Sequence, residues 1–114
     1  MNISYEGIGQ WAATFACTDV TAGHVVKVSD SGTVSACGDG DGFDGVAVAV
    51  AHDGAACSVA MGGMQTVHYT GTAPTVGQTI LTANGNGGVK TAESGRSYLA
   101  VDVDTTAQTV TIVL

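Results

Sequence analysis

The sequence predicts an all-β fold: a compact β-barrel or sandwich built from two similar hairpin-rich units, with an N-terminal arm. Over residues 46–61, apolar residues alternate with small ones on both sides of Asp53-Gly54. This period-two pattern around an Asp-Gly pair is typical of two strands joined by a short turn. The chain ends on the same pattern, because residues 99–114 align with 46–61 without a gap. No ten-residue window shows the 3.6-residue period of an amphipathic helix.

The similarity extends upstream of these two windows. Thr21-Ala22-Gly23 resembles Thr75-Val76-Gly77, and each is followed by a short apolar run and a glycine-containing turn. We therefore expect two units, 21–61 and 75–114, within a single β domain that covers 21–114. Two copies are too few for a solenoid, so the units are expected to form one closed or sandwiched body.

Residues 1–20 lie outside the expected repeat and form the N-terminal arm. The arm is rich in large side chains for a protein made mostly of Ala, Val and Gly. Two interpretations are open, because the arm could close the end of the barrel or dock on another chain. If it docks, its large side chains are the contact candidates, namely Tyr5, Ile8, Trp11 and Phe15.

The other strands follow from alternation between turn residues. Glycine in the Ser29–Gly32 turn supplies the positive φ that a hairpin requires, and Asn84–Gly88 is a second glycine-rich turn. Pro74 lies in a loop, where no hydrogen-bond donor is needed. The expected segments are a hairpin over 25–36, a single strand over 64–69, a hairpin over 78–92 and a terminal hairpin over 98–114.

Charge excludes several classes of partner. The 114 residues include ten acidic and three basic side chains, a formal net charge of −7, and only 11% are charged. A nucleic-acid binder needs clustered Lys and Arg, which this chain does not have, and an anionic membrane is excluded for the same reason. A surface built from Thr, Ser, Asn and Gly with so few charges suggests that part of it is covered by a partner.

Three cysteines lie twenty residues apart, at 17, 37 and 57. An odd number without a Cys-x-x-Cys pair favours reduced, partly buried thiols over a metal site or a disulfide framework. Met1 to Glu6 lacks the basic start and apolar run of a signal peptide, and no stretch reaches membrane-spanning length. We therefore expect synthesis in the cytoplasm.

Gly38–Gly45 places Asp39, Asp41 and Asp44 among glycines. An EF-hand loop would require a Glu at its twelfth position, but Val50 stands there when Asp39 is counted as the first. We interpret the segment as an exposed acidic loop whose carboxylates serve turn geometry, a partner contact or a weak cation site. No metal ligand set is predicted.

No catalytic or cofactor motif emerges. His52 and Asp53 are adjacent residues at a turn, where side chains generally point apart, and no His-Glu-x-x-His or Gly-x-Ser-x-Gly pattern occurs. An enzyme is not expected. A rival hypothesis is a ligand-binding β module, for which Trp11, Tyr69 and Tyr98 are the candidate sugar platforms. A small hydrolase or metal protein using His52, Asp53 and the acidic loop is a second rival.

The order of motifs resembles the small capsid decoration, or cement, proteins of tailed phages. The similarity covers about residues 18–114, through Val20-Thr21-Ala22-Gly23, Gly45-Val46-Ala47-Val48, Val59-Ala60-Met61-Gly62-Gly63 and a closing strand ending in Val113-Leu114. The resemblance implies a β-barrel-like domain without catalytic residues, often trimeric. It also implies a head-stabilising role on the exterior of the virion, bound to the major capsid protein. The alternatives are a tail or fibre module, a ligand-binding module, or a structural subunit that assembles alone.

Overall fold

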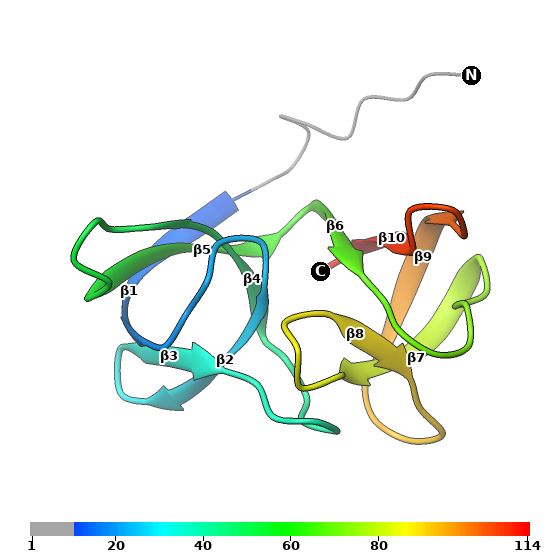
Figure 1. The fold of residues 1–114 in the computed structure, drawn as a ribbon, viewed down its shortest axis with the longest axis horizontal. Helices are drawn as coiled ribbons and strands as arrows, with labels where there is room; N and C mark the ends of the chain where they lie inside the picture. The colour runs from blue at the N-terminus through cyan, green and yellow to red at the C-terminus, as the bar shows by residue number, and fades with distance from the viewer. Residues whose placement is uncertain (1–10) are drawn as a thin grey trace.

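The computed structural model describes residues 11–114, which form ten β-strands in two sheets (Figure 1). The predicted all-β class is confirmed. Within the described residues there is no helix of the length and apolar character needed to cross a bilayer. The strands are β1 (Trp11–Thr18), β2 (Val25–Asp30), β3 (Thr33–Ala36), β4 (Gly45–Val50), β5 (Ala56–Gly62), β6 (Met64–His68), β7 (Gly77–Ala83), β8 (Val89–Thr91), β9 (Ser97–Asp104) and β10 (Thr109–Val113).

The first five strands close into a barrel with the order β1-β3-β2-β4-β5. Hairpins join β2 to β3 and β4 to β5, as the turn residues predict. The barrel closes through β1, which runs antiparallel to β5 along its length and parallel to β3 at Ala16–Thr18. Closure removes the free sheet edges that would otherwise be open to other chains.

Trp11–Thr18 is therefore a strand of the barrel, which for this stretch agrees with the first interpretation of the arm, that it closes the barrel; the β domain thus includes β1 and is not limited to 21–114. Phe15 and Cys17 alternate inward to the barrel core, whereas Thr14 and Ala16 lie on the exposed side. Alanine on both faces of the strand weakened the period-two signal that would have identified it. Residues 1–10 lie outside the described part of the chain.

The second sheet contains the last five strands in the order β6-β10-β9-β7-β8 (Figure 1). When the strands of each half are numbered from first to fifth along the chain, both sheets pair the first with the fifth, the fifth with the fourth, the fourth with the second and the second with the third. The difference is at the ends, where β8 and the residue after β6 meet only at one parallel bridge, Tyr69 to Val89. The second half is thus arranged like the first but is barely closed.

A β-bulge changes which side chains of β4 and β9 point inward. The pairing of β4 with β5 skips Val48, and the pairing of β9 with β10 skips Val101. A bulge inserts one residue without a partner and so reverses which positions point inward. Val48 is consequently 45% exposed and Ala47 is buried, although the alternation of valines favoured the opposite arrangement.

Two clusters of buried side chains hold the domain together. One fills the barrel and includes Val26, Val34 and Val59. The other combines residues of the second sheet, such as Leu81 and Ile112, with side chains from the barrel half. The barrel half contributes Val25, Cys37, Phe43 and Val46 to this second cluster. The two halves therefore share a core and pack as one body.

Candidate interaction surface

The predicted arm contacts divide into two groups. Tyr5 and Ile8 lie outside the described residues. Trp11 begins β1 and is 59% exposed, with its indole against Gly62, where a side chain would collide with the ring. Phe15 is half-buried against the barrel core. Of the two described candidates, Trp11 is the one that presents a large ring at the surface.

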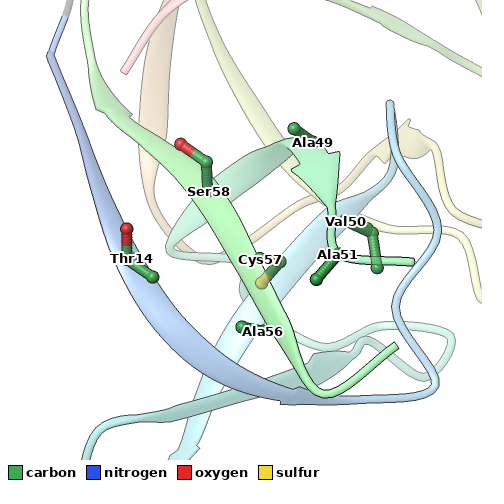
Figure 2. Close-up of a pocket in the computed structure, with 7 residues that line it drawn as sticks. All are labelled: Thr14, Ala49, Val50, Ala51, Ala56, Cys57 and Ser58. Carbon is green, nitrogen blue, oxygen red and sulfur yellow. The ribbon is translucent and has the colours of Figure 1, made fainter. Parts of the chain in front are cut away.

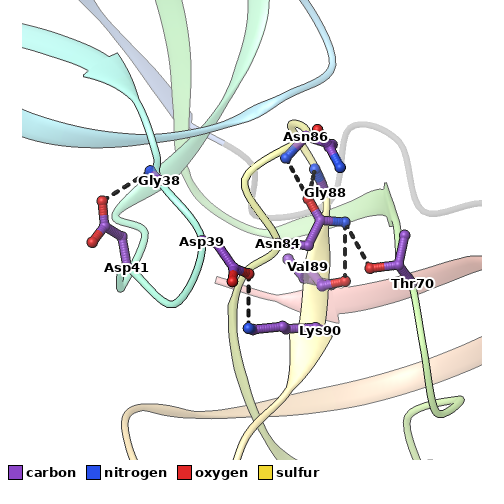
Figure 3. Close-up of polar contacts among 9 residues, drawn as sticks. All are labelled: Gly38, Asp39, Asp41, Thr70, Asn84, Asn86, Gly88, Val89 and Lys90. Atoms are coloured by element: carbon purple, nitrogen blue, oxygen red, sulfur yellow. Dashed lines mark hydrogen bonds and ion pairs between the residues drawn. The ribbon is translucent and has the colours of Figure 1, made fainter.

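The acidic loop is bound to its own chain (Figure 3). Asp41 pairs with Lys27 at 2.6 Å and accepts the Gly38 N–H at 2.9 Å, and Asp39 pairs with Lys90 at 2.7 Å. Asp44 accepts a hydrogen bond from the backbone N–H of Val28, in β2, at 2.8 Å. All three predicted carboxylates therefore have partners within the protein.

These contacts fix the loop against the second sheet. The Gly40 N–H donates to the Ala83 carbonyl and the Ala83 N–H donates to the Asp41 carbonyl, both at 2.8 Å. The Lys27 side chain donates a hydrogen bond to Asp41, which lowers the pKa of that carboxyl, and the same hydrogen bond raises the pKa of Lys27. The loop thus joins the two halves, a role that the sequence did not indicate because the partners are distant along the chain.

Asn84 organises the turn beside this loop (Figure 3). Its Oδ1 accepts the N–H groups of Asn86 and Gly88 at 2.8 and 3.1 Å, and its Nδ2 donates to the Thr70 hydroxyl at 3.2 Å. Gly88 packs against the backbone carbonyl of His68, so a side chain would not fit there. The predicted glycine-rich turn therefore fastens the near-open end of the second sheet.

Tyr98 links the second sheet to the barrel half. Its ring stacks on Phe43 with centroids 4.7 Å apart, and its hydroxyl donates to the Phe43 carbonyl at 3.0 Å. Burial raises the pKa of Tyr98. Tyr98 and Tyr69 are 2% and 4% exposed, so both were wrong as candidate sugar platforms, and of the three proposed rings only Trp11 is accessible.

A shallow depression of about 250 Å³ lies over β1, β4 and β5 (Figure 2). Small residues line it, and its polar groups are the hydroxyls of Thr14 and Ser58 together with the Cys57 thiol. Burial raises the pKa of Cys57 to about 11, so the thiol stays protonated at neutral pH and is a poor nucleophile. The depression offers no acid, base or reactive thiolate.

The other candidate chemical groups have structural roles or remain separate. Asp53 accepts the Ala55 N–H at 3.0 Å and so caps the turn that also contains the exposed His52. The cysteines at 17, 37 and 57 are buried free thiols, as predicted. Across residues 11–114, no group of three or more His, Cys, Asp or Glu side chains is placed to hold a metal ion.

The described residues thus form an all-β module whose surface carries, among other features, an exposed indole and a shallow, uncharged depression. Among solved structures, the chain is similar to the head fiber gp8.5 N base of bacteriophage phi29. The TM-score is 0.64 at 22% sequence identity, over 92% of this chain and 93% of the other. The likeness shows that the two share a fold. No family model matches the chain, and no curated protein does.

Proposed function

We propose that this chain is a decoration protein of a tailed-phage head. In this role it binds the outer surface of the icosahedral shell and stabilises the head by bridging subunits of the major capsid protein. The observation that carries the proposal is the fold shared with a head fiber base over nearly the whole of both chains. The resemblance of the Gly- and Val-rich motifs to capsid decoration proteins supports it independently.

The architecture suits a protein that acts through its surfaces. A closed barrel sharing a core with a second sheet is a stiff body, so little conformational entropy is lost when it is immobilised on a lattice. Weak contacts repeated by the symmetry of a shell add up to stable attachment, and a trimer would multiply them further. The exposed ring of Trp11 is proposed to bind the capsid surface, and Tyr5 and Ile8, which precede it in the sequence, are proposed to contact the shell with it.

The test uses heads of the encoding phage prepared without this protein. Added protein should co-sediment with these heads to saturation and raise the temperature at which they release DNA. Trp11→Ala should weaken binding, because exposed aromatic anchors carry much of an interface's binding energy. Val28→Ala, which also removes an exposed apolar side chain but on the far side of the barrel, is the matched control. The proposal is refuted if the protein does not co-sediment with the heads and does not raise the temperature at which they release DNA.

A fibre-base role is the second candidate, and the head fiber base among the similar structures favours it. A base module attaches a fibre and has no need to bridge capsid subunits. It should therefore bind heads without changing their temperature of DNA release. Light scattering of the free protein separately measures whether it is the expected trimer.

A further inference from the structure

The second sheet carries a row of apolar side chains on the face turned away from the core. Met64, Val113 and Leu99 stand directly opposite one another across β6, β10 and β9, which lie side by side (Figure 1). Directly opposed residues share a face of the sheet. Ile112 and Ala100, the next residues on two of these strands, are buried in the core, so the row points outward. Leu99 is 41% exposed. We call these three residues the outer row.

A polar, acidic margin borders the outer row on the same three strands. Thr66, Thr111 and Asp102 form the neighbouring row; Thr111 is 4% exposed, with its hydroxyl 2.8 Å from that of Thr66, so Thr66 and Asp102 are the exposed groups of this row. Asp104 stands at the next outward position of β9, and both aspartates are exposed. An apolar centre with a polar rim is the usual layout of a protein interface.

The Lys and Arg side chains of the protein all have partners away from this face. Lys27 pairs with Asp41, Lys90 pairs with Asp39, and the guanidinium of Arg96 lies 4.7 Å from the centre of the Tyr98 ring. The chain has only three Lys and Arg residues in total. The acidic margin therefore pairs with none of the Lys and Arg side chains of its own chain, and a second copy could supply only Lys and Arg side chains that already have partners in that copy.

We propose that the outer row and its acidic margin dock a different protein, whose surface presents an apolar patch bordered by Lys or Arg. Charge complementarity selects this occupant over a second copy of the chain. The inference rests on the proposed function, in which the occupant is the major capsid protein. It deepens that function by adding the face of β6, β10 and β9 to the contact that Trp11 is proposed to make.

The test compares two substitutions with matched controls. Leu99→Asn removes the most exposed side chain of the row, and Val28→Asn makes a similar change at a 48% exposed valine on β2. The pair Asp102→Asn and Asp104→Asn neutralises the margin. Asp53→Asn is its control, because Asp53 and Asp104 both accept backbone N–H groups in a hairpin turn.

Binding to protein-free heads is measured by co-sedimentation at about 50 and about 500 mM NaCl. Leu99→Asn should weaken binding by about tenfold or more, as expected when a leucine no longer becomes buried. Neutralising the margin should weaken binding at low salt and reduce its salt dependence. The inference is overturned if these variants bind like their controls. It is also overturned if Leu99→Asn lowers the mass of the free protein in sedimentation velocity, because a second copy would then occupy the row.

A readout without heads separates this inference from the proposed function. The probe is a chromatography resin whose ligand combines a benzyl ring with a quaternary ammonium. The Leu99 and aspartate variants should elute earlier than their respective controls, whether or not the protein binds heads. If heads fail to bind the wild-type protein but this difference persists, the proposed function fails and the docking face stands. Equal elution of the variants and their controls would overturn the docking face.

Discussion

Tyr98→Phe should destabilise the whole domain, although it removes a single oxygen atom. The lost group is the hydroxyl that donates to the Phe43 carbonyl at 3.0 Å, in a contact between the two halves. A typical hydrogen bond contributes about 0.5–1.5 kcal/mol, and leaving a buried partner unsatisfied costs about 1–3 kcal/mol. We therefore expect the free energy of unfolding to fall by about 1–2 kcal/mol, which lowers Tm by about 4 °C per kcal/mol for a domain of this size.

The matched control is Tyr69→Phe. Tyr69 is also buried, but within the described residues its hydroxyl makes no hydrogen bond. The change there should be close to neutral. Stability is measured by urea unfolding followed with two probes, the fluorescence of Trp11, the only tryptophan, and far-UV circular dichroism of both sheets. If the halves form one cooperative unit, the two transitions coincide in the wild type and shift together in Tyr98→Phe.

Two results would contradict this reasoning. Equal stability of the two Tyr→Phe variants would show that the Tyr98 hydroxyl contributes nothing net. A shift seen by circular dichroism but not by Trp11 fluorescence would show that the second sheet unfolds apart from the barrel. Phe43→Leu, alone and combined with Tyr98→Leu, then measures the ring stacking, with an expected coupling of about 0.5–1.5 kcal/mol.

Three further predictions concern packing, topology and pH. Gly45→Ala should destabilise the fold by about 1–3 kcal/mol in urea unfolding, because its Cβ would lie 2.6 Å from a backbone oxygen, whereas Gly42→Ala has open space and should be neutral. Deleting residues 2–15 removes most of β1 and should abolish cooperative unfolding by calorimetry, whereas a deletion ending before β1 should not. Burial raises the pKa of the Cys37 and Cys57 thiols from 9.0 to about 11, so the unfolded chain loses these protons at lower pH than the folded chain does. The free energy of unfolding should therefore fall as pH rises from 9 to 11, and it should fall less in Cys37→Ala and Cys57→Ala.

The strands were predictable because their signals are local. Alternation and glycine-containing turns mark the β2–β3 and β4–β5 hairpins in the sequence, and each of these pairs forms between neighbours along the chain. The parallel pairing of β1 with β3 is not local, and alanines obscure the alternation in β1. Closure of the barrel therefore required the three-dimensional structure.

The faces of the strands and the partners of charged groups were less predictable. A bulge at Val101 is invisible to a period-two count, yet it places Leu99 outside and Val103 toward the core. The acidic loop was identified as a feature, but the lysine that pairs with Asp39 belongs to β8 and no local signal connects them. Long-range pairing decides such contacts, and a single sequence does not encode them in any short window.

The two halves of the domain have the same strand order but differ in closure and in surface. We infer that they are copies of one unit, because the bulges at Val48 and Val101 fall at positions that align in the ungapped sequence windows. If so, the copies have diverged in closure and in surface. The first half seals its edges into a barrel, whereas the second is fastened by one bridge and by Asn84. The second half also presents the outer row. A closed copy can supply stability while an open copy presents a flat face to a partner, so substitutions in the outer row should affect binding far more than unfolding.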